Sequence, residues 1–349
     1  MDASTGWRAA GTLYHRYFTG LLLTVVTRRS AADAGELTFR LFRKQHHEKF
    51  LSSLGKLGLD GLPDPVKAAG YHYLSNRIGG VSVEFVRESD AKAWVHFVPP
   101  RWIYDGAAIC GIPSEVSRGV LRGWYAQNGP SLGNPRLGFV CCQQTTDGQP
   151  GLSGYFLEHD RELQPEERLR FSPGELPPRF DPTAAPKLDE AAWTPERLAK
   201  ANRNYAMEYV KNALPILAEI FGPAEAAHLG RVTGRLIGMQ FYAEIAAILD
   251  AKPGAEGFAL LMGRLATGQD DACEVEIGRS GAVVRQTSWR LMRGVANVPD
   301  SVFEGWNGLL EGLLAVHDRF LVLDVRRRLD RGDAAFEWEI RPRAPAGAY

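Results

Sequence analysis

Residues 81–102 read VSVEFVRESDAKAWVHFVPPRW, with apolar and polar side chains alternating on both sides of a Glu-Ser-Asp turn. Alternation with a period of two is typical of strands with one buried face, so this stretch predicts a β-hairpin. A helical segment around Trp124 follows, led by Pro113. Residues 136–160, RLGFVCCQQTTDGQPGLSGYFLEHD, then predict a second hairpin that turns at Asp147-Gly148.

The same order recurs further along the chain. Residues 273–289, CEVEIGRSGAVVRQTSW, predict a hairpin, a helix led by Pro299 follows around Trp306, and residues 320–340, FLVLDVRRRLDRGDAAFEWEI, close the pattern. Two helical patterns precede each copy, and residues 50–80 pair with residues 213–238, which leaves 252–271 as an insert. We therefore expect an α+β fold built as a tandem duplication of a helix-helix-ββ-α-ββ unit. Each unit would hold a four-stranded antiparallel sheet with helices on one face.

This interpretation divides the chain into four parts. Residues 1–35 are expected to form an N-terminal arm packed on the body, because they carry many large apolar side chains. Residues 36–163 and 201–343 are the two α+β repeats. Between them, residues 164–200 contain seven prolines and little periodicity, so they predict a crossing arm.

Composition limits the classes of partner. The chain has 41 basic and 41 acidic residues and no net charge, whereas nucleic acids and anionic membranes both call for a concentrated basic field. The four cysteines show neither a CxxC pair nor a secreted spacing pattern, and no apolar run approaches the length of a membrane span. We expect a cytoplasmic protein with reduced thiols that binds a small molecule, and a homodimer remains open.

The closing stretch RLDRGDAAFEWEI, from Arg328 to Ile340, resembles the terminal strand motif of two related groups. One is the 4-vinyl-reductase-type ligand-binding domains, and the other is the 2-aminothiazoline-4-carboxylic acid hydrolase-like proteins. Gly332-Asp333 and the alternating aromatic strand match, but Phe336 stands where those groups have a cysteine. The resemblance implies a small-molecule pocket between helices and a curved sheet. The absent cysteine means that the zinc site of some sensors in this group cannot be carried over.

Two residues of the first repeat are candidates for catalysis. Cys110 lies in the loop PPRWIYDGAAICGIP and could act as a nucleophile if a base lowers its pKa, although a buried small apolar role is the alternative. His96 lies on a predicted strand and could be that base, because imidazole titrates near neutral pH. A structural, hydrogen-bonded histidine is the alternative there.

Further side chains of the first repeat are candidates for substrate binding. A guanidinium offers two parallel donors to a carboxylate, and aromatic rings supply flat apolar walls. The loop after the first hairpin and the two segments beyond it provide both types. The candidates are Arg101, Trp102, Tyr104, Trp124, Asn134 and Arg136. In the second repeat Arg235, Trp289, Arg290 and Arg293 could close the pocket, with surface ion pairs as the alternative.

Neither a metal nor an organic cofactor is expected. The adjacent His46 and His47 cannot point in one direction on a helix, and there is no HExxH or paired CxxC motif. The glycines of GRVTGRLIG recur at every fourth position within a helix, whereas a dinucleotide fingerprint would follow a strand.

From the resemblance, we expect an enzyme that acts on a polar carboxylate or heterocyclic substrate. It would hydrolyse a C–N or C–S bond or catalyse a related reaction. Cys110 and His96 would carry the chemistry, and Arg101 would hold the substrate. A non-catalytic ligand-binding or sensor protein is the first alternative. A structural partner in a biosynthetic complex, docked through the proline-rich arm, is the second.

Overall fold

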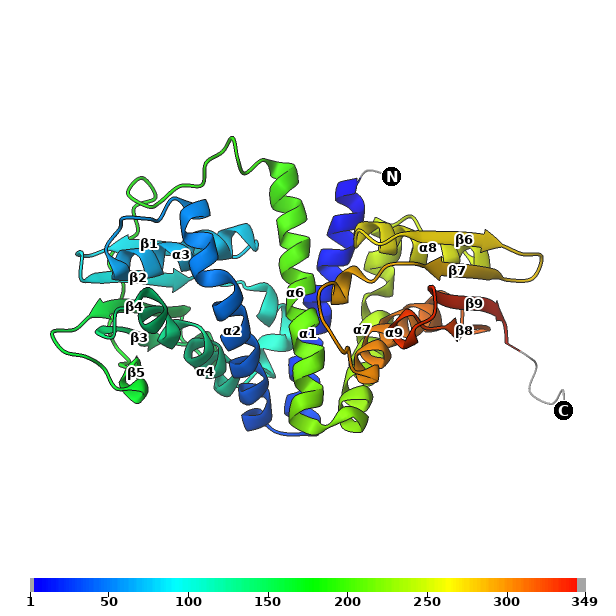
Figure 1. Cartoon of the computed structure of the whole chain (residues 1–349), viewed down its shortest axis with the longest axis horizontal. Coiled ribbons are helices and arrows are strands. Elements are labelled where there is room, and N and C mark those ends of the chain that lie inside the picture. Colours follow the sequence, from blue (N-terminus) through cyan, green and yellow to red (C-terminus); the bar gives the residue numbers. More distant parts are fainter. Residues whose placement is uncertain (1–2, 344–349) are drawn as a thin grey trace. The chain divides into compact units, whose positions relative to one another are not determined.

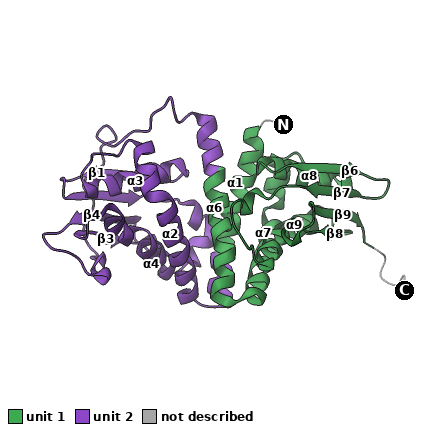
Figure 2. Cartoon of the chain, viewed as in Figure 1, with its two compact units in different colours: residues 1–21, 203–349 green, residues 22–202 purple. Residues whose placement is uncertain are grey.

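A computed structural model of the chain describes residues 3–343. The chain folds into two compact units. Unit 1 comprises residues 1–21 and 203–349, and unit 2 comprises residues 22–202 (Figure 2). The α+β class is confirmed, since each unit combines helices with one sheet (Figure 1). Among the described residues, none of the helices has the length and apolarity that crossing a membrane requires.

Unit 2 contains a mixed sheet with helices on one face. Its main helices are α2 (Ala31–Leu54), α3 (Asp64–Ile78), α4 (Ser114–Gly123) and the short α5 (Asn128–Leu132). Its strands are β1 (Val83–Arg87), β2 (Lys92–Phe97), β3 (Leu137–Gln143), β4 (Leu152–Glu158) and β5 (Leu169–Phe171). The sheet order is β1-β2-β4-β3-β5, and β5 runs parallel to β3.

The expected four-stranded antiparallel sheet is therefore wrong for this unit. β5 lies inside the segment that was expected to be an arm without regular structure. It adds to β3 because its neighbours supply backbone hydrogen bonds, from the Phe139 amide to the Arg168 carbonyl at 2.8 Å and from the Ser172 amide to the Cys141 carbonyl at 2.9 Å. A three-residue strand carries too little periodicity to be seen in a sequence.

Unit 1 contains an antiparallel sheet of four strands. Its helices are α1 (Ala3–Arg28, through Leu21), α6 (Pro195–Phe221, from Arg203), α7 (Pro223–Ile248), α8 (Gly254–Gly268) and α9 (Asp300–His317). Its strands are β6 (Cys273–Ile277), β7 (Ala282–Gln286), β8 (Leu321–Arg327) and β9 (Phe336–Pro342), in the order β6-β7-β9-β8.

The expected N-terminal arm of residues 1–35 consists, where the structure describes it, of α1, a break at Arg29 and Ser30, and the start of α2. The first turns of α1 belong to unit 1, where the Tyr17 hydroxyl donates to the carbonyl of Gly230 on α7 at 2.9 Å. The Tyr14 hydroxyl donates to Gln269 at 2.7 Å and accepts from the Trp306 indole at 3.0 Å. These buried bonds attach the start of the chain to elements more than 200 residues away.

The two sheets repeat one another in detail. A constant shift in residue number, which takes Leu137 to Leu321, converts every β3–β4 pair into a β8–β9 pair, so that Leu137↔Glu158 becomes Leu321↔Pro342. Each first strand has an irregularity at the same point, between Cys141 and Gln143 and between Val325 and Arg327. Each connection also contains a glycine with a left-handed backbone, Gly148 at φ 78° and Gly332 at φ 96°.

The expected pairing of helices is wrong in one place. Residues 252–271 were interpreted as an insert, yet they form α8, which has 15 residues and begins after Pro253, as α3 has 15 residues and begins after Pro63. α8 precedes β6 as α3 precedes β1, so it is the positional counterpart of α3. The glycine-rich helix α7, matched above with α3, instead packs on α9 as α2 packs on α4.

Candidate functional site

The two predicted catalytic residues lie on different elements of unit 2. Cys110 ends the 3-10 helix Gly106–Cys110 and is exposed. His96 lies in β2 and its Nδ1 atom is buried without a hydrogen-bond partner. Burial lowers the pKa of His96, and the Glu84 carboxylate partly opposes this shift. No hydrogen bond described within residues 3–343 joins the two side chains, so the structure does not show a nucleophile–base pair.

The loop after β2 holds its aromatic and basic residues against one another. The Arg101 guanidinium lies 4.7 Å from the ring centre of Phe97 and 5.4 Å from that of Tyr104. Burial raises the pKa of the Tyr104 hydroxyl, which also hydrogen-bonds Ser117. Trp102 lies in the adjoining 3-10 turn and is partly buried. Arg101 therefore packs on the aromatic rings of Phe97 and Tyr104.

Trp124 is part of the aromatic core of unit 2. Its ring stacks with Tyr71 at 5.9 Å and meets the edge of His46 at 5.6 Å between centroids. The indole Nε1 atom is buried and has no hydrogen-bond partner. This packing accounts for a tryptophan at the end of α4 without a ligand.

Asn134 and Arg136 belong to a polar network at the end of the sheet. The Asn134 amide donates to Asp64 at 3.1 Å and to Glu158 at 3.2 Å. Arg136 forms an ion pair with the same Glu158 carboxylate. The network connects the start of α3 to the end of β4. The predicted binding residues are thus divided among several places in unit 2.

A polar groove lies instead in unit 1, between α7, α9 and the edge strand β8. It consists of two adjoining clefts of about 500 and 510 Å³ that share Arg231 and Glu304. We call it the arginine groove and define it by its lining. The lining residues are Ala227, His228, Arg231, Val232, Arg235, Phe303, Glu304, Asn307, Glu311, Leu323, Val325, Arg326, Arg327, Arg328, Arg331 and Asp333.

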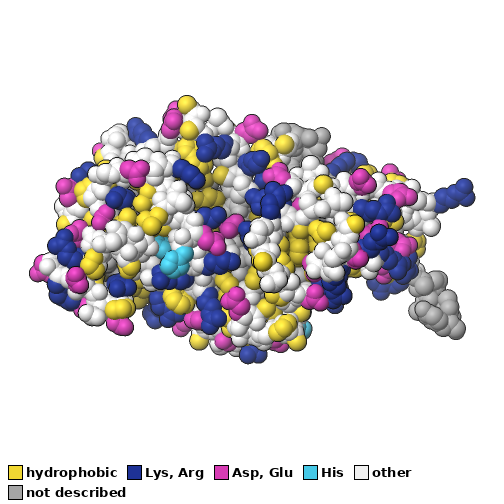
Figure 3. All heavy atoms as spheres, viewed as in Figure 1, with side chains coloured by type: hydrophobic (Ala, Val, Ile, Leu, Met, Phe, Trp, Pro, Cys, Tyr) yellow, Lys and Arg dark blue, Asp and Glu magenta, His cyan; other side chains and the backbone are white. Residues whose placement is uncertain are grey.

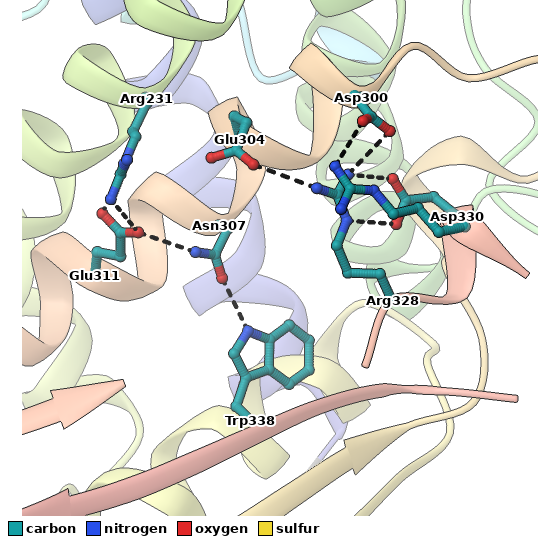
Figure 4. A network of polar contacts seen from close by, with 9 residues as sticks. Arg231, Asp300, Glu304, Asn307, Glu311, Arg328, Asp330 and Trp338 are labelled. Carbon is teal, nitrogen blue, oxygen red and sulfur yellow. Dashed lines mark hydrogen bonds and ion pairs between the residues drawn. The ribbon is translucent and has the colours of Figure 1, made fainter. Parts of the chain in front are cut away.

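One wall of the groove comes from α7 and α9. Arg231 and Arg235 lie one turn apart on α7, and both donate to Glu311 of α9, with distances of 2.9 and 2.8 Å (Figure 4 labels Arg231 and Glu311). The hydrogen bond with Glu311 raises the pKa of Arg231. The Arg231 side chain remains 51% exposed, so its guanidinium is oriented by protein and still open to a ligand.

The opposite wall is the turn that follows β8. The Arg328 guanidinium lies 3.9 Å above the ring of Phe303 and is surrounded by carboxylates of Asp300, Glu304 and Asp330 (Figure 4). Arg328 is only 7% exposed. Because its guanidinium is already paired with several carboxylates, Arg328 stabilises the turn. Arg331, which is more exposed and pairs with Asp300, lies at the rim of the groove.

The floor of the groove is held by a buried hydrogen bond. The indole of the fully buried Trp338 donates to the Asn307 amide oxygen at 2.8 Å, and the Asn307 amide group donates to Glu311 at 3.1 Å (Figure 4). Two strand positions away, Phe336 packs between Phe303 and Trp306 at 5.4 and 5.2 Å. The position where the resembling groups have a cysteine is therefore part of the hydrophobic core.

Comparisons with protein-family models, curated proteins and solved structures found nothing that matches the chain. The resemblance of residues 328–340 to the vinyl-reductase-type and hydrolase-like groups thus stays a prediction. Within residues 3–343, no group of three or more histidine, cysteine, aspartate or glutamate side chains is placed to hold a metal ion.

Our interpretation of the sequence missed most of the arginine groove. Arg235 was a candidate and does line it, whereas Trp289 packs in the core against Phe336 at 5.1 Å. The run VRRRLDR, residues 325–331, was not among the candidates. The available signal was that this run follows an alternating strand, while Arg231 and Arg235 repeat at helical spacing on one face.

Proposed function

We propose that the chain binds a small carboxylate-bearing molecule in the arginine groove. The observation that carries this proposal is the group of partly exposed arginines in the lining. The cleft of about 500 Å³ is lined by five arginines, Arg231, Arg326, Arg327, Arg328 and Arg331, and by three carboxylates. Asp300 and Asp330, outside the lining, pair with Arg328 and Arg331. On the viewed face of the protein basic and acidic side chains are intermixed (Figure 3).

The chemistry of the lining favours an anion with a carbon skeleton. Guanidinium groups bind carboxylates with paired hydrogen bonds, and those of Arg231 and Arg331 are about half exposed, at 51% and 57%. Between the walls, Phe303, Leu323 and Val325 provide apolar surface for the rest of the ligand. The carboxylates already present hold the arginines in place, which reduces the entropy lost when a ligand binds.

A catalytic role is the second candidate. The exposed thiol of Cys110 and the unpartnered Nδ1 of His96 support hydrolysis of a C–N or C–S bond, with Arg101 as the substrate-holding residue. Turnover of a bound carboxylate should then fall at least tenfold in Cys110→Ala and His96→Ala. Full turnover in both variants would remove these residues from the mechanism.

We also propose that the chain arose by tandem duplication. The shared strand order, the matching registers and the irregularities at equivalent points support this origin. We further propose a cytoplasmic location, because the four cysteines are free and the cytoplasm keeps thiols reduced.

Binding can be tested with defined anions. We expect citrate, succinate or benzoate to raise the melting temperature, and titration calorimetry to give the affinity. Arg231→Gln and Arg235→Gln should each weaken binding about 10- to 100-fold, the range for one charge-assisted hydrogen bond. Arg279→Gln is the matched control, because Arg279 is exposed in the β6–β7 turn and outside the groove.

The proposal is wrong if no anion binds or if the two α7 variants bind as the control does. Mass spectrometry of the recovered anion separates the two candidate functions. An unchanged molecule favours a binding protein, and a converted one favours an enzyme.

A further inference from the structure

The outer edge of β3 in unit 2 is covered by a short strand. β5 pairs with it in parallel, with Phe139 opposite Leu169 and Cys141 opposite Phe171. The β3 residues that pair with β5, from Phe139 to Cys141, come just before the irregularity of β3. Phe171 also lies beneath the guanidinium of Arg118 on α4, at 5.4 Å, so the added strand reaches the helix layer.

The counterpart of this edge in unit 1 is open. β8 ends the order β6-β7-β9-β8, and among the described residues no strand pairs with its outer side. The shift that relates the two hairpins takes Phe139 to Leu323 and Cys141 to Val325. By this correspondence the Leu323 amide and the Val325 carbonyl point toward the open side, as the equivalent groups of β3 point toward β5.

The arginine groove lies beside this open edge. Leu323 and Val325 line it, and Val325 is 37% exposed. A strand added to β8 in the manner of β5 would direct alternate side chains into the groove. There they would meet Arg231 and Arg327, whose side chains are 51% and 60% exposed although each has a carboxylate partner, so acidic side chains fit best.

We propose that the edge of β8 accepts an extended acidic segment of another polypeptide as a parallel fifth strand. Main-chain hydrogen bonds to Leu323 and Val325 would supply affinity, and glutamate or aspartate side chains would reach Arg231 and Arg327. This inference rests on the proposed function, because small carboxylates would occupy the positions of the segment's acidic side chains.

A fluorescein-labelled peptide of alternating threonine and glutamate, about seven residues long, is a suitable probe. We expect it to bind, to protect the amides of residues 321–327 from hydrogen exchange, and to bind at least tenfold more weakly when alternate amides are N-methylated. The glutamine version should also bind at least tenfold more weakly.

A variant of the protein tests the same edge. Leu323→Pro removes the edge amide and should weaken the peptide at least tenfold, since proline has no main-chain donor and is tolerated on the open side of an edge strand. Leu323→Val is the control. If Leu323→Pro fails to fold, the N-methylated peptide still tests whether main-chain hydrogen bonds hold the segment on β8.

Each contrary outcome has a distinct meaning. If small anions bind and the peptide does not, or if the N-methylated peptide binds equally well, the proposal of an added fifth strand is wrong. The proposed binding of carboxylates in the arginine groove then still stands. If neither anions nor the peptide bind, both the proposed function and the proposed strand are wrong. A dimer of the protein alone that protects residues 321–327 would show that a second copy occupies the edge, and would also overturn the proposal.

Discussion

His46 shows how an ionisable side chain becomes part of the core. Its ring stacks on Phe50 at 4.8 Å, and its Nε2 atom hydrogen-bonds the Ser131 hydroxyl at 2.8 Å. Burial, followed by the nearby Arg43 charge, lowers its pKa to about 3. Nearby, His72 stacks on Tyr125 at 3.9 Å and burial lowers its pKa as well. These histidines stay neutral at physiological pH, so they act as aromatic packing.

The free energy of unfolding should fall as the pH drops through the range set by His46. The unfolded histidine takes up a proton near pH 6.5, whereas the folded one resists protonation to about pH 3. His46 therefore contributes stability that is complete above pH 6.5 and is lost toward pH 3. In His46→Gln, urea unfolding from pH 4 to 7 should have a shallower pH dependence, with one proton fewer taken up. His47→Gln is the control, because His47 is exposed. Equal pH dependence in the two variants would contradict the assignment.

Cys110 should be the fast-reacting thiol of the native protein. It is exposed, whereas Cys141 and Cys142 are buried and burial raises the pKa of each to about 12. Brief treatment with N-ethylmaleimide should add one label by intact mass, and Cys110→Ala should remove it. Rapid labelling of Cys273 in that variant would contradict the prediction, since burial raises its pKa to about 11.

Among the elements, the α7–α9 pair depends on the absence of side chains. A Cβ atom on Gly234 would lie 2.7 Å from both the Gly305 oxygen and the Leu309 nitrogen, and one on Gly238 would lie 2.4 Å from the Leu309 oxygen. These are backbone atoms, which cannot rotate away. The glycine spacing of α7 therefore serves close helix packing, and this packing supports Arg231 and Arg235 above the groove.

Gly234→Ala should destabilise the protein by about 1–3 kcal/mol, the usual cost of overpacking. Gly263→Ala in α8 is the matched control, because its Cβ would meet only a methyl group of Val275 at 3.0 Å. That control should be neutral or slightly stabilising, since alanine favours helix. Thermal or urea unfolding of both variants provides the comparison. A Gly234→Ala variant as stable as the control would show that the helices can separate without loss.

At the scale of the whole molecule, the connection between β5 and α6 is a long and accessible stretch of irregular chain. Residues 172–194 contain no regular helix or strand, and most of them are exposed. Proteases need such segments because the chain must extend into their active sites. Limited trypsin treatment should first cut after Arg179 and Lys187, both of which are exposed. An Arg179→Gln, Lys187→Gln double variant should lose these fragments, and early cuts within α7 or α9 instead would contradict this view.

Local patterns in the sequence were sufficient for most elements. The alternation at residues 81–98 and 320–340 corresponds to strands, and the three- and four-residue apolar spacing before them corresponds to helices. The pairing of α3 with α7 failed because the glycines that end α3, Gly79 and Gly80, were matched with Gly238, which lies inside α7. Only the sheets show that α8 holds the place of α3. The site predicted at Cys110, His96 and Arg101 stays a prediction, and only the structure shows how those side chains are placed. Cys110, His96 and Arg101 have reactive side chains, and a sequence does not state whether such groups meet or are packed against aromatic rings.

The sequence by itself thus determined the α+β class and the order of the hairpins, because strand and helix periodicity are properties of neighbouring residues. Only the tertiary structure decided that α1 joins elements of unit 1, that β5 covers β3, and that β8 is left open beside a group of arginines. Those features depend on contacts between residues far apart in the chain. Hydrogen bonds and packing select such contacts in three dimensions, and no local pattern records them.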